Sequence, residues 1–215
     1  MIYLASDMHG VITDALEEYK RNADEADLLI ILGDLGMWFE NTEDNKSFTQ
    51  YMLSYPKKVA LVDGNHENHE KINSFPIETW NKGRVHRISK NIVHLMRGEI
   101  FEINEKSFFV IGGCASSQKW INAGKPWYDG EAPTEDEIIY AKENLRKYSN
   151  SVDYILTHKY LQEDSLTAPP NSLEGLIHYL KSSVKYNAWY FGHDHIDMSL
   201  DEKHFYVYDI LRKIT

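Results

Sequence analysis

Five segments of this sequence place an aspartate, asparagine or histidine directly after a short apolar run. The polar residues in these segments are Asp7, His9, Asp34, Asn65, His66, His158, His193 and His195. Imidazole and carboxylate ligands without thiolates suit Zn, Mn, Fe or Co better than Ca. Even with His66 left out, seven candidate ligands are too many for one tetrahedral ion, whereas one carboxylate can bridge two ions. The pattern therefore predicts a site for two metal ions.

Two neighbouring ions suit one class of reaction in particular. Ions about 3.5–4 Å apart clamp both the attacking and the leaving oxygen of a phosphoryl displacement. A water that bridges such ions loses its proton near neutral pH, which gives a nucleophile without a protein base. The sequence thus predicts a metal-dependent hydrolase that acts on phosphate esters.

Each segment alone has an ordinary explanation. Asp-x-His is common in a capped turn, and Gly-Asp after a strand is frequent turn chemistry. A single histidine such as His158 is more often a hydrogen-bonded structural group than a ligand. The joint occurrence of all five segments, each at the end of an apolar run, favours the functional interpretation.

The apolar runs are short and continuous, as expected for buried strands. They cover 2–6, 28–32, 59–62, 108–111, 154–156 and 188–191. Amphipathic patterns at 12–23 and 48–55 separate the first three runs and predict helices, so the chain begins with β-α-β units of a parallel sheet. Ligands bind at the carboxyl ends of strands in such sheets. The polar segments therefore meet at one edge.

The middle of the chain has a different pattern. From Arg84 to Cys114 there is no helical period, and short β-like pieces predict consecutive hairpins in a second sheet. Thr134 then begins a helix, with Glu137 three residues later completing a capping box. Ser172 is expected to cap a further helix.

In this order, the five motifs resemble those of the calcineurin-like metallophosphoesterases. The resemblance spans Asp7 to His195 and includes the stretch Gly64-Asn65-His66-Glu67. It implies an α/β fold, a four-layer α/β/β/α sandwich of two mixed sheets flanked by helices. It also implies two divalent transition-metal ions, with Mn as first choice and Fe, Zn, Co or Ni as alternatives.

The same resemblance implies a role for each motif residue. One ion would be held by Asp7, His9, Asp34 and His195, and the other by Asp34, Asn65, His158 and His193, so that Asp34 bridges. His66 would be the general acid that protonates the leaving oxygen. Many family members carry a second Asp three residues after the bridging one, where this chain has Met37. The resemblance therefore gives no orienting partner for His66, and Glu67 is expected to support the site from behind the ligands.

Composition limits the possible partners and compartment. The 215 residues carry a formal charge of −10 without a basic block, which argues against binding extended nucleic acid but not against a small anion at a metal site. No run of about 18 apolar residues suggests a membrane span. Because Cys114 is the one cysteine, no disulfide framework is expected, and the compartment is predicted to be the cytoplasm. We expect one domain over 1–215.

The sequence favours a phosphodiester as substrate. No arginine lies between Arg21 and Arg84, so the Gly-Asp and Gly-Asn-His loops lack the bidentate groups that family members use to hold a monoester dianion. The expected substrate is a small, nucleotide-like phosphate ester. The alternatives are a phosphomonoesterase or protein phosphatase, and a non-catalytic metal-bound interaction module on the same fold.

The remaining aromatic, histidine and cysteine residues match no motif. A group of aromatic residues either packs loops onto the sheet or forms a stacking wall for a base or aromatic leaving group. This group is Trp38, Phe39, Trp120, Trp127 and Tyr128. Structural roles are expected for His69, His86, His94, His178 and His204, and Cys114 is predicted to be a small buried residue.

Overall fold

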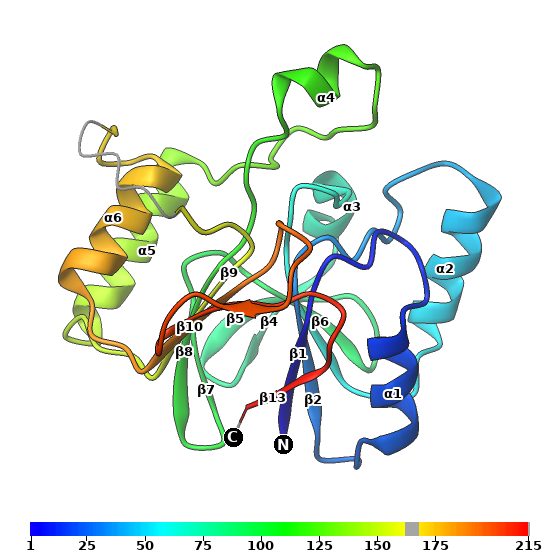
Figure 1. Ribbon diagram of the computed structural model, residues 1–215, viewed down its shortest axis with the longest axis horizontal. Coiled ribbons are helices and arrows are strands. Elements are labelled where there is room, and N and C mark those ends of the chain that lie inside the picture. Colours follow the sequence, from blue (N-terminus) through cyan, green and yellow to red (C-terminus); the bar gives the residue numbers. More distant parts are fainter. Residues whose placement is uncertain (162–167, 215) are drawn as a thin grey trace.

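The computed structural model describes residues 1–161 and 168–214. Two mixed β-sheets pack face to face, and helices cover the outer face of each sheet (Figure 1). The predicted α/β class with a four-layer α/β/β/α arrangement is confirmed. The predicted single domain over 1–215 includes residues 162–167 and 215, which lie outside the described residues, and the domain count stays a prediction.

The first sheet contains the three strands that the N-terminal pattern predicted. Within the described residues its order is β13-β1-β2-β3-β6-β5-β4. The bounds in that order are Arg212–Ile214, Ile2–Ala5, Leu28–Leu32, Val59–Val62, Ile92–Leu95, Gly83–Arg87 and Ile77–Trp80. Strands β1, β2, β3 and β6 are parallel, and the other three are antiparallel to their neighbours. Every residue of β2 and β3 is buried, because both faces of the sheet are covered.

The second sheet contains the two other strands that end in histidine motifs. Its order within the described residues is β11-β12-β10-β9-β8-β7. The bounds in that order are Met198–Ser199, His204–Tyr206, Ala188–Phe191, Tyr154–Thr157, Lys106–Ile111 and Ile100–Ile103. Strands β8, β9, β10 and β12 are parallel, so β8, β9 and β10 end at the same edge.

The helices form the two outer layers. Their bounds are α1 Asp14–Asn22, α2 Glu43–Leu53, α3 His69–Asn73, α4 Gln118–Asn122, α5 Glu135–Lys147 and α6 Leu173–Ser183. Helices α1 and α2 pack on the first sheet, and α5 and α6 pack on the second (Figure 1). The capping box of Thr134 and Glu137 and the Ser172 cap are both present, which confirms these two predictions. Helix α4 projects from the top of the molecule.

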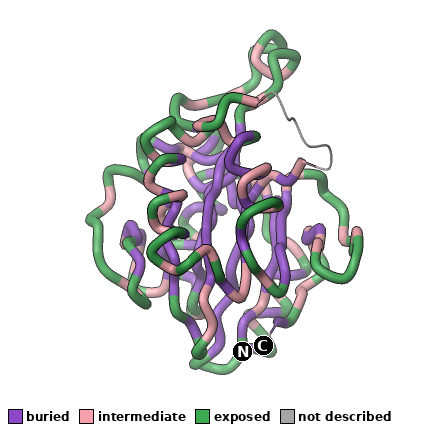
Figure 2. The backbone as a smooth tube through the Cα atoms, turned by 90° about the vertical axis from the view of Figure 1, so that its left-hand side faces the viewer, coloured by how far each residue is buried: buried purple, intermediate pink, exposed green. Residues whose placement is uncertain are grey.

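The largest apolar layer lies between the sheets. There, residues of the first sheet such as Ile30 and Val62 pack against Phe108 and Leu156 of the second. Figure 2 shows buried strands in the middle and exposed loops around them, with both termini at the bottom. Strand β1 therefore runs from the bottom toward the end of the molecule that carries α4, and the metal-ligand motifs lie at that end.

One prediction about the second sheet is partly wrong. The segment from Arg84 to Cys114 does form hairpins, but β5 and β6 belong to the first sheet and only β7 and β8 to the second. Strand β6 pairs in parallel with β3, where Val59 aligns with Ile92. The local β-pattern of β6 cannot specify that it pairs with β3, because this pairing joins residues about thirty positions apart in sequence.

Candidate metal centre

The loops that follow five strands meet at one end of the interface between the sheets. The Asp7 amide donates to the Gly33 carbonyl at 3.0 Å, which joins the loops after β1 and β2. The His193 amide donates to Asp7 Oδ2 at 2.9 Å, which joins the second sheet to the first. The structure thus brings together all eight residues that the sequence singled out.

Two glycines let these loops approach so closely. A Cβ on Gly33 would lie 2.1 Å from His158 Nδ1, and Gly33 itself has a φ of +97°. A Cβ on Gly64 would lie 2.1 Å from Asp34 Oδ1. Glycine is therefore required before Asp34 and before Asn65 because a side chain there would clash with a neighbouring loop.

Most of the candidate ligands have a strained backbone. Positive φ angles between 49° and 73° occur at Asp7, His9, Asp34, His193 and His195. Left-handed backbone in residues other than glycine is uncommon and costs free energy, so the surrounding contacts must hold it in place. Such strain concentrates at functional sites, and here it turns the side chains toward one another.

The first group of ligand atoms comes from the loops after β1 and β10. His9 Nε2 and His195 Nε2 lie 2.9 Å apart, and Asp7 Oδ1 lies 3.6 Å from His195 Nε2 and 4.0 Å from His9 Nε2. The His195 ring stacks on Tyr208, with 5.0 Å between ring centroids. Asp7 Oδ1 is buried and has no hydrogen-bond partner among the described residues.

The second group comes from the loops after β3, β9 and β10. His158 Nε2 lies 3.2 Å from Asn65 Oδ1 and 3.2 Å from His193 Nδ1. His158 is completely buried, and its Nδ1 donates to the Leu32 carbonyl at 2.8 Å. This bond leaves the lone pair on Nε2, the nitrogen that faces the other two ligand atoms.

Asp34 lies between the two groups. Its Oδ2 is 3.6 Å from His9 Nε2, and its Oδ1 is 3.5 Å from His158 Nε2. The His66 amide donates to the same Oδ1 at 2.7 Å. One carboxylate therefore presents one oxygen to each group of ligand atoms.

The electrostatics of this centre fit divalent cations. Burial raises the pKa of Asp7, and burial together with the charge of Asp7 raises the pKa of Asp34 well above its usual range. Burial, followed by neighbouring imidazoles, lowers the pKa of His9 and His193 to about 3, so both rings are neutral ligands at pH 7. Lys159 contributes to the low pKa of His193 but pairs with Asp194 at 3.5 Å. Lone pairs and buried carboxylates thus converge as in a transition-metal site.

His66 lies beside the first group and is enclosed by aromatic rings. Its Nδ1 is 3.0 Å from His9 Nδ1. The Phe39 ring stacks on the imidazole at 4.9 Å with an interplanar angle of 6°, and Trp120 lies 4.7 Å away on a tilted plane. Burial lowers the pKa of His66 to about 4. Ring contacts therefore fix the position of His66 where the family often uses an aspartate.

Met37 and Glu67 support the centre from behind. Met37 is buried in the apolar layer under α2. The buried Glu67 carboxylate accepts from the Leu35 amide at 2.6 Å and from the Gly64 amide at 2.7 Å. Burial and the charge of Asp34 raise its pKa. Glu67 thus ties the loop after β2 to the loop after β3.

A sixth strand end also reaches the centre, and sequence reasoning missed it. Cys114 Sγ, after β8, lies 3.3 Å from Asn65 Oδ1. Asn65 Nδ2 donates to Ser116 Oγ, and Glu131 accepts from both the amide and the hydroxyl of Ser116. The signal was available, because 108–111 is an apolar run that ends in Gly112-Gly113-Cys114.

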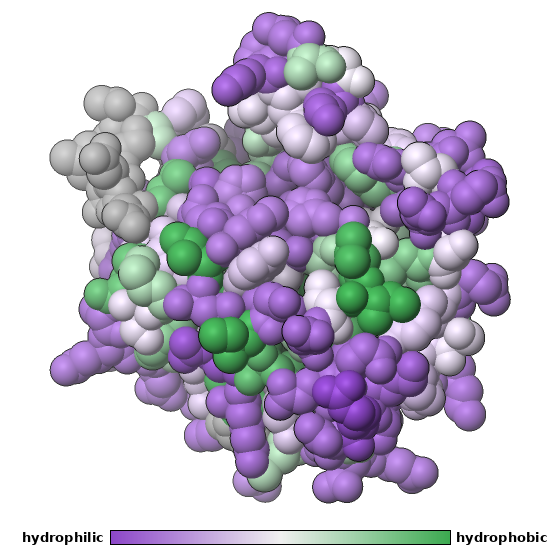
Figure 3. All heavy atoms as spheres, turned by 45° about the vertical axis from the view of Figure 1, so that its right-hand side comes forward, coloured by the Kyte–Doolittle hydropathy of each residue, from purple (hydrophilic) through white to green (hydrophobic). Residues whose placement is uncertain are grey.

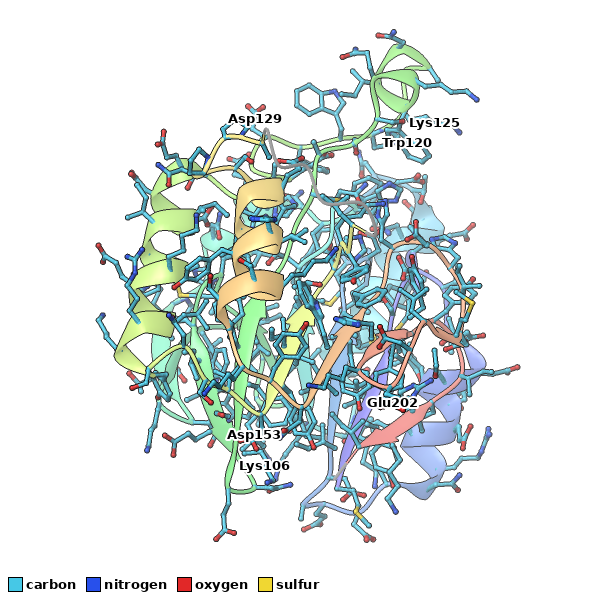
Figure 4. The ribbon with its side chains drawn as sticks, turned by 60° about the vertical axis from the view of Figure 1, so that its left-hand side comes forward. Lys106, Trp120, Lys125, Asp129, Asp153 and Glu202 are labelled. Carbon is cyan, nitrogen blue, oxygen red and sulfur yellow. The ribbon has the colours of Figure 1, made fainter. Side chains whose placement is uncertain are left out.

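His66 and Trp120 line two hollows. The larger has about 600 Å³ and is lined by Ser117, Leu173 and Lys159 among others. The smaller has about 360 Å³ and is lined by Phe39, Glu40 and Asp44 among others. Figure 4 places Trp120 on the α4 segment, at the opposite end of the molecule from Lys106 and Asp153.

Of the other predicted aromatic residues, Trp38 and Tyr128 have packing roles. The Trp38 ring lies 5.5 Å from Phe75, and the Tyr128 hydroxyl donates to the Phe39 carbonyl at 3.0 Å. Trp127 is exposed and lines neither hollow. Figure 3 shows the α4 segment as a mostly hydrophilic projection at the top of the molecule. No described helix is both long and apolar enough to cross a membrane.

Comparison with solved structures gives several chains to which this chain is similar. It is similar to a proposed 5′-nucleotidase from Staphylococcus aureus, solved with alpha-ketoglutarate, at 13% identity and a TM-score of 0.49. The match covers 96% of this chain and 48% of that one, so this chain spans about half of that protein's length. A phosphopantetheinyl hydrolase from Mycobacterium tuberculosis matches at 14% identity and a TM-score of 0.46, over 99% of this chain and 95% of that one.

A protein of unknown function from Aquifex aeolicus matches at 15% identity and a TM-score of 0.41, over 86% of this chain and 87% of that one. No curated protein matches the sequence. A family model described as calcineurin-like phosphoesterase matches residues 1–197, which is most of the chain. This chain therefore belongs to the calcineurin-like phosphoesterase family.

Proposed function

We propose that this protein is a two-metal phosphodiesterase. The position of Asp34 carries the proposal, because its two carboxylate oxygens face His9 in one ligand group and His158 in the other. One ion would be held by Asp7, His9, Asp34 and His195, and the other by Asp34, Asn65, His158 and His193. Membership of the family supports hydrolysis of a phosphate ester.

Bound divalent ions would neutralise the phosphate and supply a deprotonated water near neutral pH. The chain itself provides the surrounding groups. His158 and Asn65 are held by the Leu32 carbonyl and by Ser116, so they approach the centre in fixed orientations. Fixed ligands lower the cost of reorganisation when charge develops on the phosphate.

His66 is proposed to donate the proton that the leaving oxygen takes up. The ring is held between Phe39 and Trp120 and lines both hollows, so it faces the place where an ester oxygen would leave. Without bound ions or substrate, burial lowers the pKa of His66 to about 4. A bound anionic phosphate raises that pKa, because an opposite charge nearby favours the protonated imidazole.

The two hollows favour a diester. A diester carries two organic groups, and two hollows share His66 and Trp120 among their lining residues. Neither hollow has an arginine among its described lining residues, which leaves a monoester dianion without a bidentate partner. Lys159 lines the larger hollow but pairs with Asp194 at 3.5 Å. An aromatic substituent could stack on Trp120, so a small nucleotide-like diester is the proposed substrate.

The test compares an aryl phosphodiester with the aryl phosphomonoester that has the same leaving group. At saturating Mn²⁺, kcat/KM should be higher for the diester. Asp34→Ala serves as control and should lose both activities, which excludes a contaminating phosphatase. A monoester preference of tenfold or more would overturn the choice of diester in favour of a phosphomonoesterase. The cytoplasmic location expected from the sequence stays a prediction.

A further inference from the structure

The thiol of Cys114 lies against the second group of ligand atoms. Its Sγ is 3.3 Å from Asn65 Oδ1 and 3.6 Å from His193 Nδ1. The sulfur and one nitrogen from each of His158 and His193 all lie within 4.8 Å of one another, as in a metal site. Cys114 is therefore part of a cluster whose other members are ligand candidates on different strands.

The loop that carries Cys114 is fixed on both sides. The Gly113 amide donates to the Asp63 carbonyl at 2.7 Å, and a Cβ on Gly112 would lie 2.3 Å from that same carbonyl oxygen. Two residues later, the Ser116 amide donates to Glu131 at 2.8 Å. Cys114 itself is buried, with 6% of its surface exposed. The sulfur is thus held in place by contacts that do not involve the thiol.

The spacing of the four atoms matches a thiolate-containing site. An ion with bonds of about 2.1 Å to nitrogen or oxygen and about 2.3 Å to sulfur, at bond angles of about 90–120° as in four- or five-coordinate sites, places neighbouring ligand atoms about 3.0–3.8 Å apart. The observed separations are 3.2 Å from His158 Nε2 to Asn65 Oδ1 and 3.2 Å from His158 Nε2 to His193 Nδ1. The sulfur separations of 3.3 and 3.6 Å fall in the same range.

We propose that Cys114 is an additional ligand of the ion at the second position, beside Asp34, Asn65, His158 and His193. This inference rests on the proposed two-ion centre. On binding, the S–H bond breaks, the proton passes to solvent, and the sulfur forms a bond to the ion without any change of oxidation state. Thiolate is a soft ligand, so the second position would favour Zn²⁺ or Co²⁺ over Mn²⁺. The first position, with only nitrogen and oxygen atoms, would lack this preference.

Cobalt provides a readout that does not depend on activity. A thiolate bound to Co²⁺ gives an intense charge-transfer band in the near ultraviolet, and the sequence has a single cysteine, so any such band comes from Cys114. Metal-free protein is titrated with Co²⁺ while bound metal and the absorption spectrum are measured. The band should grow with the ion that fills the second position.

Cys114→Ser and Cys114→Ala serve as variants that keep the loop contacts. Each should lose the band, and competition against a chelator should show Zn²⁺ affinity at the second position at least about tenfold weaker. Mn²⁺ affinity should change less than Zn²⁺ affinity. Circular dichroism checks the fold, and the spectrum of the unaltered protein tests the proposal even if both variants fail to fold.

The outcomes separate this proposal from the proposed function. Two bound cobalt ions without a thiolate band would overturn the ligand role and leave Cys114 as a hydrogen-bond donor to Asn65. Failure to bind a second ion would overturn both proposals. A thiolate band in a protein that hydrolyses no phosphate ester would support the ligand role and contradict the function.

Discussion

Two clusters in this molecule bury aspartate carboxylates beside histidines. They differ in how the buried negative charge is compensated. One is the candidate metal centre. The other, called here the Asp63 cluster, consists of Asp63, His69, His86, His94 and Arg97. In it, Arg97 Nε donates to Asp63 Oδ2 at 2.8 Å and His94 Nε2 lies 3.1 Å from Asp63 Oδ1. All five residues of the Asp63 cluster are buried.

The difference is the source of positive charge. Burial opposes ionisation of Asp63, but Arg97 and then His94 outweigh it and hold the pKa of the carboxyl well below its usual range. In the metal centre, burial and Asp7 raise the pKa of Asp34, and none of the described contacts supplies a guanidinium. Arg97 is an internal cation that completes the Asp63 cluster, whereas the candidate metal centre has the chemistry to take a cation from solution.

The two clusters are neighbours along the chain. Asp63 and Asn65 lie on either side of Gly64, directly after β3, and their side chains enter different clusters. A histidine next to a carboxylate therefore does not identify a metal site. What distinguishes the metal centre is convergent lone pairs, strained backbone and an unpartnered carboxylate oxygen at Asp7.

The largest expected effect comes from removing the carboxylate between the ligand groups. Asp34→Ala should lose both ions and with them all measurable phosphoesterase activity, because each ion loses one ligand and the shared charge. Elemental analysis of purified protein should give two ions per chain for the unaltered protein and none for the variant. One ion retained tightly by Asp34→Ala, or a single ion in the unaltered protein, would contradict the bridging role.

The next effect separates catalysis from metal binding. His66→Ala should keep both ions but lose about 10²–10⁴ in kcat, the usual contribution of a general acid. The loss should shrink for esters with good leaving groups, which need little protonation. His69→Gln is the matched control, because His69 is three residues away but belongs to the Asp63 cluster. An equal loss for good and poor leaving groups would mean that His66 positions the phosphate.

The Asp63 cluster should respond in stability and not in metal content. Arg97→Met leaves the buried Asp63 carboxylate without its guanidinium, and breaking such a pair typically costs about 3–5 kcal/mol. Urea denaturation should show this loss in unfolding free energy, and added metal should not restore it. Adding Asp63→Asn should recover part of the loss. If Zn²⁺ or Mn²⁺ restored the unfolding free energy of Arg97→Met, the Asp63 cluster would also be a metal site, which would contradict the proposed difference between the clusters.

That the motif residues come together was predictable because strand ends are a local signal. A run such as 59–62 followed by Gly64-Asn65-His66 shows where a side chain emerges, and parallel pairing then brings separate ends together. Phe39, Tyr208 and Glu131 were not predictable in their roles, because their contacts join residues far apart in sequence. Cys114 was predicted to be a small buried residue, and it is buried. Its place beside Asn65 and His193 depends on contacts between residues far apart in sequence.

In the fold, too, some features follow from local sequence signals and others do not. Helix α5 has a local capping box, and it was predicted correctly. Ile12 was predicted to lie on the buried face of the first helix, but it is 46% exposed and precedes α1. The Thr13 side chain accepts a hydrogen bond from the Leu16 amide and caps the helix, so α1 begins at Asp14. Hydrophobic period alone does not locate such a boundary.

The smallest expected effect tests the Asp63 cluster by pH. Burial lowers the pKa of His69 and His86 to about 4 in the folded protein, against about 6.5 when unfolded. The unfolded chain therefore binds more protons at pH 5, so stability is full above pH 6.5 and is lost as the pH falls toward 4. Each histidine should cost about 1–2 kcal/mol between pH 7 and pH 5.

His86→Asn removes one of these titrating groups, so the loss of unfolding free energy between pH 7 and pH 5 should be smaller in the variant by that amount. Both proteins are measured by urea denaturation with a chelator present, because metal affinity also changes with pH. The histidines of the metal centre titrate equally in both proteins and cancel in the difference. An unchanged difference between the two pH values would mean that His86 remains as easily protonated in the folded protein as in the unfolded chain.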